Sequence, residues 1–272
     1  MPTIEVQPQY TVLDPSTRND TGNRLLLFGE GHDAKVLKLY RERYTAIGSF
    51  CSSGSHRLLE RKRGISPKAR YRTEVATLAK WKEHGFDVFQ HLDMPLPEQF
   101  DPPGIWLEYC PGKTMGEIFK DPEIEEVEKV ELVTRLARDS GWRHKVAFQL
   151  NEPLLVQEHA TIRHVMVYGD RLIRFDFENG FLPKFHIVEA LAQELASCLK
   201  SIVRCSGEAS DPLFAAFASA YPEPALLREV LDWGVCHRGL YRRVRRWYDQ
   251  KRRPGQSKTD SLARLRSMIV EA

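Results

Sequence analysis

The feature that most constrains the fold is a change in hydrophobic spacing around residues 110–113, Cys-Pro-Gly-Lys. Before this segment, short apolar runs with strand character surround a single helical stretch, whereas after it apolar residues recur mainly at helical spacing. A Pro-Gly pair between two such regions is typical of a linker. The sequence therefore predicts an α+β, bilobal protein, with a β-rich lobe over residues 1–110 and a mostly helical lobe over residues 111–272. The strands are expected at 10–13, 24–28, 34–40, 88–92 and 105–109, and the first helix at 69–85.

The helical half contains one interruption, between residues 153 and 180. Two short apolar runs lie in it, and a Tyr-Gly-Asp-Arg segment at 168–171 joins them. A tight Gly-Asp turn between apolar runs predicts a β-hairpin. Helices are expected at 127–141, 187–203, 212–220 and 225–233 and in the C-terminal tail.

The charge of the chain is small overall but unevenly distributed. The 272 residues carry a net charge of +3, so the molecule as a whole is not expected to bind nucleic acid. From Arg238 to Arg266, however, eleven Lys or Arg stand against two Asp, and residues 57–68 are also basic. These basic segments suit a peripheral contact with an anionic membrane, and a solvated helix face explains the tail equally well.

Cysteine usage and the N-terminus indicate a cytoplasmic protein. The five cysteines form no Cys-x-x-Cys pair, which argues against a disulfide framework and a cysteine zinc site. The first residues lack the basic and apolar regions of a secretory signal, and no apolar run reaches the ~20 residues of a spanning helix. We expect a location in the cytoplasm or at the inner membrane surface; the oligomeric state is left open.

Two charged residues in the first half are candidates for an ion pair. Lys38 stands within the apolar run 36–40, where its ammonium group must pair or reach solvent. Glu74 lies near the start of the expected helix, beside its apolar side, and could turn inward to meet Lys38. Buried pairs of this kind are common at functional sites. The alternative is an exposed lysine on an edge strand and a surface glutamate near a helix N-terminus.

The segment after the hairpin offers two carboxylates. Asp176 follows an apolar strand, and Glu178 lies two residues further on. Carboxylate oxygens suit a hard ion such as Mg²⁺, which also takes phosphate oxygens. Glu178 could supply a second ligand or a hydrogen bond. The alternative is a strand-end turn with two solvated acids.

The order of these features resembles that of the protein-kinase-like superfamily, in particular its atypical bacterial branch. The nearest similarity is to the lipopolysaccharide core kinases that phosphorylate heptose or Kdo sugars. The resemblance spans roughly residues 20–205 and is carried by the segments 36–40, 107–115, 173–178 and 194–199 together with Glu74 and Leu78.

This resemblance implies a set of roles. ATP would bind between the lobes, near Lys38 and Glu74 and the backbone of Glu108 and Cys110. Mg²⁺ would be held by Asp176 and Glu178, and the γ-phosphate would pass to a hydroxyl of a small molecule or glycolipid, such as a sugar of the lipopolysaccharide core or a related glycan. Two segments are candidates for the loop that covers the nucleotide. They are the turn at 29–31, Gly-Glu-Gly, and residues 14–23.

The expected catalytic loop departs from the family pattern, which is His-x-Asp followed by an Asn. In the matching residues 156–167, one alignment puts His159 in the Asp position and His164 in the Asn position, whereas another puts Thr161 in the Asp position. Neither alignment supplies the Asp. Glu158 or His159 could replace it as the base, and His164 could act as a metal ligand or phosphate contact.

Three interpretations of this loop remain open. The chain could be a phosphotransferase with an alcohol acceptor, which we favour. It could be a pseudokinase that binds nucleotide, or only a partner, without transferring phosphate. The two histidines also suggest a transition-metal site, for which the sequence offers no clear third ligand.

Overall fold

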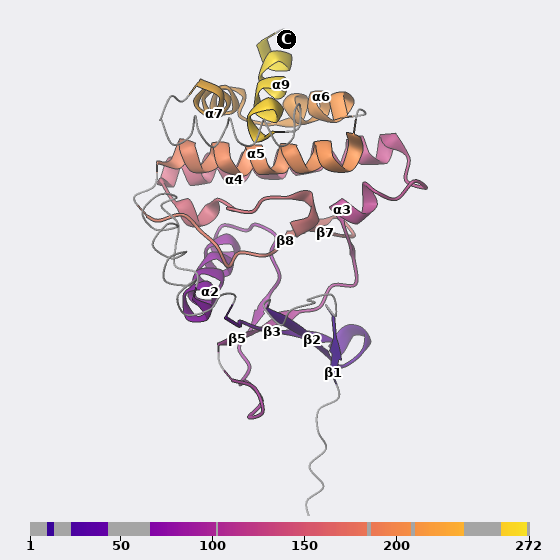
Figure 1. The fold of residues 1–272 in the computed structure, drawn as a ribbon, viewed down its shortest axis with the longest axis vertical. Coiled ribbons are helices and arrows are strands. Elements are labelled where there is room, and N and C mark those ends of the chain that lie inside the picture. The colour runs from indigo at the N-terminus through magenta and orange to yellow at the C-terminus, as the bar shows by residue number, and fades with distance from the viewer. Residues whose placement is uncertain are drawn as a thin grey trace, which may run out of the picture.

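The computed structural model describes residues 10–13, 23–42, 66–101, 103–183, 186–207, 210–236 and 257–270. It consists of a β-sheet region and a helical region, with a short hairpin and helix α2 lying between them (Figure 1). The prediction of an α+β architecture, with a β-rich first part and a mostly helical second part, is confirmed. The turn-rich segment 14–22, the basic residues 57–63 and Cys51, and the tail residues 237–256 lie outside the described residues.

The first region is a five-stranded antiparallel sheet with the order β1-β2-β3-β5-β4. A single 3-10 turn, Gly31–Asp33, connects β2 to β3. The strand expected at 88–92 pairs over two residues only, because Val88 leaves the sheet and bridges to Arg174 of the hairpin. The strands are β1 (Tyr10–Val12), β2 (Arg24–Phe28), β3 (Lys35–Leu39), β4 (His91–Leu92) and β5 (Gly104–Glu108).

Side chains of β3 alternate between the two faces of the sheet, which explains a lysine in an apolar strand. Leu37 and Leu39 point to one face, where they pack with Leu26 and Trp106. Lys38 points to the other face, which α2 (Pro67–Glu83) covers. The strand pattern therefore delivers one charged side chain to the side of the sheet that faces the rest of the molecule.

Helix α2 joins the sheet to the helical region. It begins at a Ser66 N-cap, whose hydroxyl accepts a hydrogen bond from the Ala69 amide, and Pro67 occupies the first turn as expected for a helix start. Near its other end, buried Trp81 donates its indole N–H to the Leu154 carbonyl at 2.9 Å. The helix is thus held at both ends.

The helical region is built on two long helices, α4 (Glu126–Leu150) and α5 (Ile187–Ser206). Helix α4 continues well beyond the expected end at Gly141. That glycine is a point of close approach, because a Cβ there would lie 2.3 Å from Cδ of Pro222. The other elements are β6 (Lys113–Thr114), α3 (Met115–Ile118), the 3-10 turns η2 (Pro153–Leu155) and η3 (Ile162–His164), β7 (Val165–Tyr168), β8 (Arg171–Arg174), α6 (Ser210–Ala220) and α7 (Pro224–Cys236).

The predicted hairpin is present, and a third strand extends it. β7 and β8 pair in register across the Gly169-Asp170 turn, and β6 adds to β7. The expected linker 110–113 therefore ends inside a small sheet. Gly112 is required there, since a Cβ would fall 2.4 Å from the Val167 carbonyl oxygen.

The described part of the basic tail is helix α9 (Lys258–Val270), which packs on α5 and α7 through Leu262 and Leu265. Its arginines are paired within the chain: Arg264 contacts Asp211 and Arg266 contacts Asp232, each at 2.6 Å. Among the described helices, none combines the length and apolarity needed to cross a membrane.

Candidate active site

The central contact of the site is an ion pair between the sheet and α2. Lys38 Nζ lies 2.6 Å from Glu74 Oε2, and both side chains are almost completely buried. Tyr40, two residues after Lys38 on the same face of the strand, donates its hydroxyl to the same carboxylate oxygen at 2.6 Å. Glu74 is thereby held by two donors and cannot swing away from Lys38 without leaving a buried charge unpaired.

A second buried carboxylate, Glu178, lies beside this pair. Its Oε1 is 3.6 Å from Lys38 Nζ and accepts a hydrogen bond from Asn23 Nδ2 at 2.7 Å. Its Oε2 accepts from fully buried Arg70 at 2.6 Å, and Arg70 also binds the Asn23 amide oxygen and the Arg41 carbonyl. Glu178 therefore ties the segment after the hairpin to α2 and to the residue preceding β2.

The charges around Lys38 favour its ammonium form. Burial works against that charge, but Glu74, Glu178 and Asp176 together outweigh it and raise the Lys38 pKa above its ordinary value. A lysine held in this way is a permanent cation near neutral pH, which is what contact with a phosphate requires.

Asp176 is held in an unusual state. Its backbone adopts φ = 68°, a left-handed conformation that is uncommon for residues other than glycine. Burial raises the pKa of its carboxyl from 3.8 to about 6; Lys38 opposes the shift, while Glu178 adds to it through its charge and a shared hydrogen bond. Strained backbone and a raised pKa often occur together where a residue serves a ligand rather than the fold.

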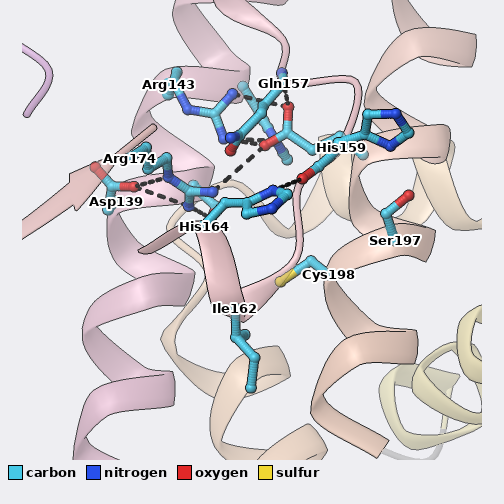
Figure 2. A network of polar contacts seen from close by, with 12 residues as sticks. Asp139, Arg143, Gln157, His159, Ile162, His164, Arg174, Ser197 and Cys198 are labelled. Atoms are coloured by element: carbon cyan, nitrogen blue, oxygen red, sulfur yellow. Dashed lines mark hydrogen bonds and ion pairs between the residues drawn. The ribbon is translucent and has the colours of Figure 1, made fainter. Parts of the chain in front are cut away.

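The loop 156–161 is fixed to its surroundings on two sides. The Gln157 amide donates to Glu194 Oε2 on α5 at 2.7 Å, and the Gln157 side chain donates to the Phe175 carbonyl, next to Asp176, at 2.7 Å. Figure 2 shows Gln157 close to Arg143, with His164 and His159 in the same view. The loop and the residue before Asp176 thus move together.

Beneath the loop lies a buried network centred on Glu194. Arg143 donates to both Glu194 oxygens and to the Leu155 carbonyl, and His144 Nε2 lies 3.4 Å from Glu194 Oε1 (Figure 2). Arg174, at the end of β8, contacts Asp139 Oδ2 at 3.0 Å. Burial opposes the Glu194 charge, but Arg143 and His144 lower its pKa well below the usual range.

His164 is placed opposite Asp176. Its Nδ1 lies 2.8 Å from the His159 carbonyl oxygen, and its Nε2 lies 3.5 Å from Asp176 Oδ2. The structure therefore brings His164 and Asp176 together, and this contact is compatible with the alignment through His159 and with the alignment through Thr161 alike.

His159 forms a pair with the residue before it. Its Nε2 is 2.9 Å from Glu158 Oε2; the glutamate side chain is buried, while about half of the histidine side chain (51%) is exposed. An imidazole held by a carboxylate on one nitrogen keeps the other nitrogen available as a base. The arrangement can accept a proton from a hydroxyl that reaches it from solvent.

Glu108 is the last residue of β5 and Cys110 is the first residue of the linker; the Glu108 side chain contacts Gln90 and Arg171. The Glu108 carboxylate accepts from the Gln90 amide at 3.0 Å and from Arg171 at 3.4 Å. Cys110 is buried, and burial together with the Glu108 charge raises its thiol pKa against the opposing effect of Arg171. Any nucleotide contact from Glu108 would thus fall to its backbone.

The strand register separates the two candidate covering loops. Lys38 pairs with Leu25 at the start of β2, whereas Lys35 pairs with Phe28 beside the 29–31 turn. The glycine turn is therefore at the far end of β3 from Lys38. Asn23, the residue before β2, is at the near end.

Sequence reasoning missed three members of the site: Asn23, Tyr40 and Arg70. Two had a readable signal. Tyr40 follows Lys38 by two residues in a strand, and Arg70 precedes Glu74 by four in a helix, so each shares a face with a predicted residue. Asn23 had no such signal, because only the fold brings it to Glu178.

The residues present fit a metal ion that is bound partly by a nucleotide. In the described ranges, no group of three or more His, Cys, Asp or Glu could hold a metal ion on its own. Asp176 and His164 present one oxygen and one nitrogen toward each other. Ions that accompany nucleotides typically take one or two protein ligands and complete their shell with phosphates and water.

Comparison with known proteins gives similarity at the level of structure only. No family model and no curated protein matches the chain. One similar solved structure is WaaP in complex with acyl carrier protein, with 14% identity, a TM-score of 0.46, and coverage of 82% of this chain and 86% of that one. Another is a pseudokinase in its apo form, with 13% identity, a TM-score of 0.38, and coverage of 93% and 89%.

Proposed function

We propose that this protein is an ATP-dependent kinase that transfers phosphate to a hydroxyl group. The observation that carries the proposal is the linked set Glu158–His159–His164–Asp176, in which the His159 carbonyl accepts from His164, beside the Lys38–Glu74 pair. It gathers a base, an ion-binding position and a phosphate-binding cation in one place, and these are the requirements of phosphoryl transfer.

His159 is the base in this mechanism. His159 Nε2 lies 2.9 Å from Glu158 Oε2, so we assign the ring proton to Nε2 and the lone pair to Nδ1. The acceptor hydroxyl gives its proton to Nδ1 as its oxygen bonds to the γ-phosphorus and the bond to the β-phosphate oxygen breaks, leaving ADP. Glu158 stabilises the imidazolium that forms.

The remaining residues bind and position the nucleotide. Lys38, held by Glu74, neutralises phosphate charge, and the backbone of Glu108 and Cys110 takes the adenine edge. Asp176 is the carboxylate ligand of the ion, and Glu178 acts through its hydrogen bond to Asp176 and its contact with Lys38. When bound, the ion supplies charge neutralisation at the β- and γ-phosphates.

The acceptor we propose is a sugar hydroxyl of the lipopolysaccharide core or a related glycan, presented at the inner face of a membrane. This part rests on the sequence resemblance and on the basic segments at 57–68 and 238–256. The arginines of α9 do not serve it, because Asp211 and Asp232 already pair with them.

One observation favours the alternative, a pseudokinase that binds nucleotide or a partner without transfer. The chain lacks the carboxylate base of the family, and Glu178 already occupies a position 3.6 Å from Lys38, where a phosphate would compete with it. In this alternative, half-exposed His159 and buried Glu158 form a pair without a chemical role.

The test measures binding and transfer separately. Thermal unfolding with ATP and a divalent ion is compared for the wild type and Asp176→Asn, and ADP release is measured with purified core oligosaccharide as acceptor. A kinase shows an ion-dependent rise in melting temperature that Asp176→Asn removes, and ADP release that His159→Ala lowers by about 10²–10⁴-fold.

Each negative result has a distinct meaning. No thermal shift with any nucleotide and ion contradicts both the kinase and the nucleotide-binding pseudokinase. A shift without ADP release on any glycan acceptor supports the pseudokinase. Full ADP release in His159→Ala, with Glu158→Gln as the matched variant, removes the base assignment.

A further inference from the structure

We infer that the ion held by His164 and Asp176 is a transition metal that accepts nitrogen, with Mn²⁺ as its representative, in preference to Mg²⁺. This inference rests on the proposed nucleotide site and concerns its metal specificity. The sequence offered no clear third ligand for a metal site built on the two histidines. The structure instead pairs one histidine with Asp176.

The protonation pattern of His164 directs a lone pair at Asp176. A carbonyl oxygen can only accept a hydrogen bond, so the contact with the His159 carbonyl at 2.8 Å requires a proton on His164 Nδ1. In the neutral ring, Nε2 is then unprotonated, and this is the nitrogen that lies 3.5 Å from Asp176 Oδ2. A second-shell hydrogen bond of this kind fixes the tautomer of metal-binding histidines generally.

The ring is also held in place before any ion arrives. The Phe175 amide donates to the His164 carbonyl at 3.2 Å, and the His164 and Phe175 rings pack with centroids 5.6 Å apart. The Phe175 carbonyl in turn accepts from Gln157. Phe175, the neighbour of Asp176, thus also holds His164 in place. Figure 2 shows the contact between the His164 ring and the His159 carbonyl.

The separation of the two ligand atoms fits a shared ion. With metal–ligand bonds of roughly 2.0–2.2 Å, two neighbouring ligands of one ion are about 3.0–3.5 Å apart, depending on whether the geometry is octahedral or tetrahedral. The 3.5 Å between Nε2 and Oδ2 is at the upper end of this range. Binding would need a small inward movement of one side chain.

The nitrogen ligand decides the choice of ion. Mg²⁺ prefers oxygen ligands throughout and releases its water reluctantly. Imidazole instead suits the later first-row transition ions. Affinity for a site with a nitrogen ligand is lowest for Mn²⁺ within that series and rises toward Co²⁺. A site with an amide oxygen in this position would favour Mg²⁺ more, so His164 shifts the preference of the nucleotide site toward the transition series.

The experiment uses the full-length protein with ADP and Mn²⁺, Co²⁺ or Mg²⁺ as probes. Nucleotide affinity is measured with each ion, and pulsed EPR of bound Mn²⁺ reports on nitrogen ligands. In the wild type we expect imidazole ¹⁴N coupling and at least tenfold tighter ADP binding with Mn²⁺ than with Mg²⁺. In His164→Asn we expect the coupling to disappear and the ratio of the two affinities to fall toward one.

Two further variants keep the result interpretable. His164→Gln is a second oxygen-bearing replacement in case His164→Asn fails to fold, and His32→Asn removes an exposed imidazole on the turn at the far end of β3. The inference predicts that His32→Asn keeps both the coupling and the affinity ratio.

The outcomes separate this inference from the proposed function. Equal ADP affinity with Mn²⁺ and Mg²⁺, or ¹⁴N coupling that persists in both His164 variants, overturns the metal preference and leaves the kinase proposal standing. If no ion raises ADP affinity, both the inference and the proposed function are wrong.

Discussion

Two groups of buried charges occupy this protein, one around Glu194 in the helical region and one around Lys38 between the sheet and α2. In the first, Glu194 has two arginines and a histidine as partners, and the pKa of its carboxyl is held well below its ordinary value. In the second, Lys38 lies among three carboxylates, and the pKa of Asp176 is raised to about 6. The two groups place their acids in opposite electrostatic states: the pKa of Glu194 is lowered and the pKa of Asp176 is raised.

The opposite pKa shifts of Glu194 and Asp176 indicate that the two groups of charges serve different purposes. The Glu194 group satisfies its acid fully and uses it to hold the Gln157 amide, so it positions the loop. The Lys38 group retains an acid that is costly to ionise, in a strained backbone conformation. An ion bound at Asp176 would relieve that cost, whereas the Glu194 group has nothing to gain from a ligand. Neutralising the two acids, Glu194 and Asp176, should therefore change stability with opposite signs.

The largest effect is expected for Glu194→Gln. It removes the acid that faces the buried Arg143 and Arg174, so unfolding free energy should fall by about 3–5 kcal/mol, measured by chemical denaturation. Because the native pKa of Glu194 is depressed, its contribution is present above the ordinary value of 4.5 and should be lost as pH falls below it.

The control for this prediction is Glu131→Gln, on the exposed face of α4, which should change stability by less than about 0.5 kcal/mol. A Glu194→Gln variant as stable as this control would show that the network contributes nothing to folding.

Lys38→Met should cost less, about 2–4 kcal/mol, although Lys38 is as buried as its partners. Its carboxylates keep other donors: Glu74 keeps Tyr40, and Glu178 keeps Arg70. Lys35→Met, three residues earlier on the opposite face of β3, is the matched control. If Lys38→Met lost more unfolding free energy than Glu194→Gln, the Lys38 group would contribute more to stability than the Glu194 group, contrary to this prediction.

Asp176→Asn should stabilise the protein at pH 7 in the absence of nucleotide and ion. The native pKa is raised from 3.8 to about 6, so ionisation of Asp176 disfavours folding as pH rises through this window. The gain should be about 1–3 kcal/mol at pH 7 and vanish below about pH 4. Asn also tolerates the left-handed backbone.

Urea denaturation of the wild type and Asp176→Asn at pH 3.5, 5 and 7 measures this effect. A destabilised variant at pH 7 would mean that Asp176 serves the fold, as Glu194 does.

The smallest effects compare two tyrosines. Tyr40→Phe removes a donor to a buried carboxylate and should cost about 1.5–2 kcal/mol, because hydrogen bonds to charged groups are stronger. Tyr221→Phe removes the 2.8 Å contact with His144 and should cost about 1 kcal/mol. Thermal melts of both variants check the order, and equal losses would mean that the charge on Glu74 adds nothing.

Element types followed from the sequence where periodicity was clear. The strands around Leu26 and Leu37, the hairpin at Gly169 and the helix that carries Glu74 all lie where apolar spacing and turn residues placed them. The failures were local. Gly141 suggested a helix end but is a packing contact with Pro222, and Lys113 was expected to end a linker but pairs with Val167 of β7.

The charged residues of the candidate site were predicted from the sequence, but their partners were not. Lys38, Glu74, Asp176 and Glu178 were identifiable because charged residues beside apolar runs need partners. The partners themselves depend on distant segments: Asn23 reaches Glu178 across 155 positions, and Glu194 reaches Gln157 across 37.

What the sequence by itself determined is the order of strands and helices and the presence of isolated charges within apolar surroundings, since both follow from local spacing. Only the tertiary structure decided which charges meet. The 2.6 Å Lys38–Glu74 contact, the orientation of His164 toward Asp176 and the hydrogen bond that fixes its tautomer all require segments to be packed in three dimensions. Electrostatic states depend on distance and burial, and neither quantity exists until the chain has folded.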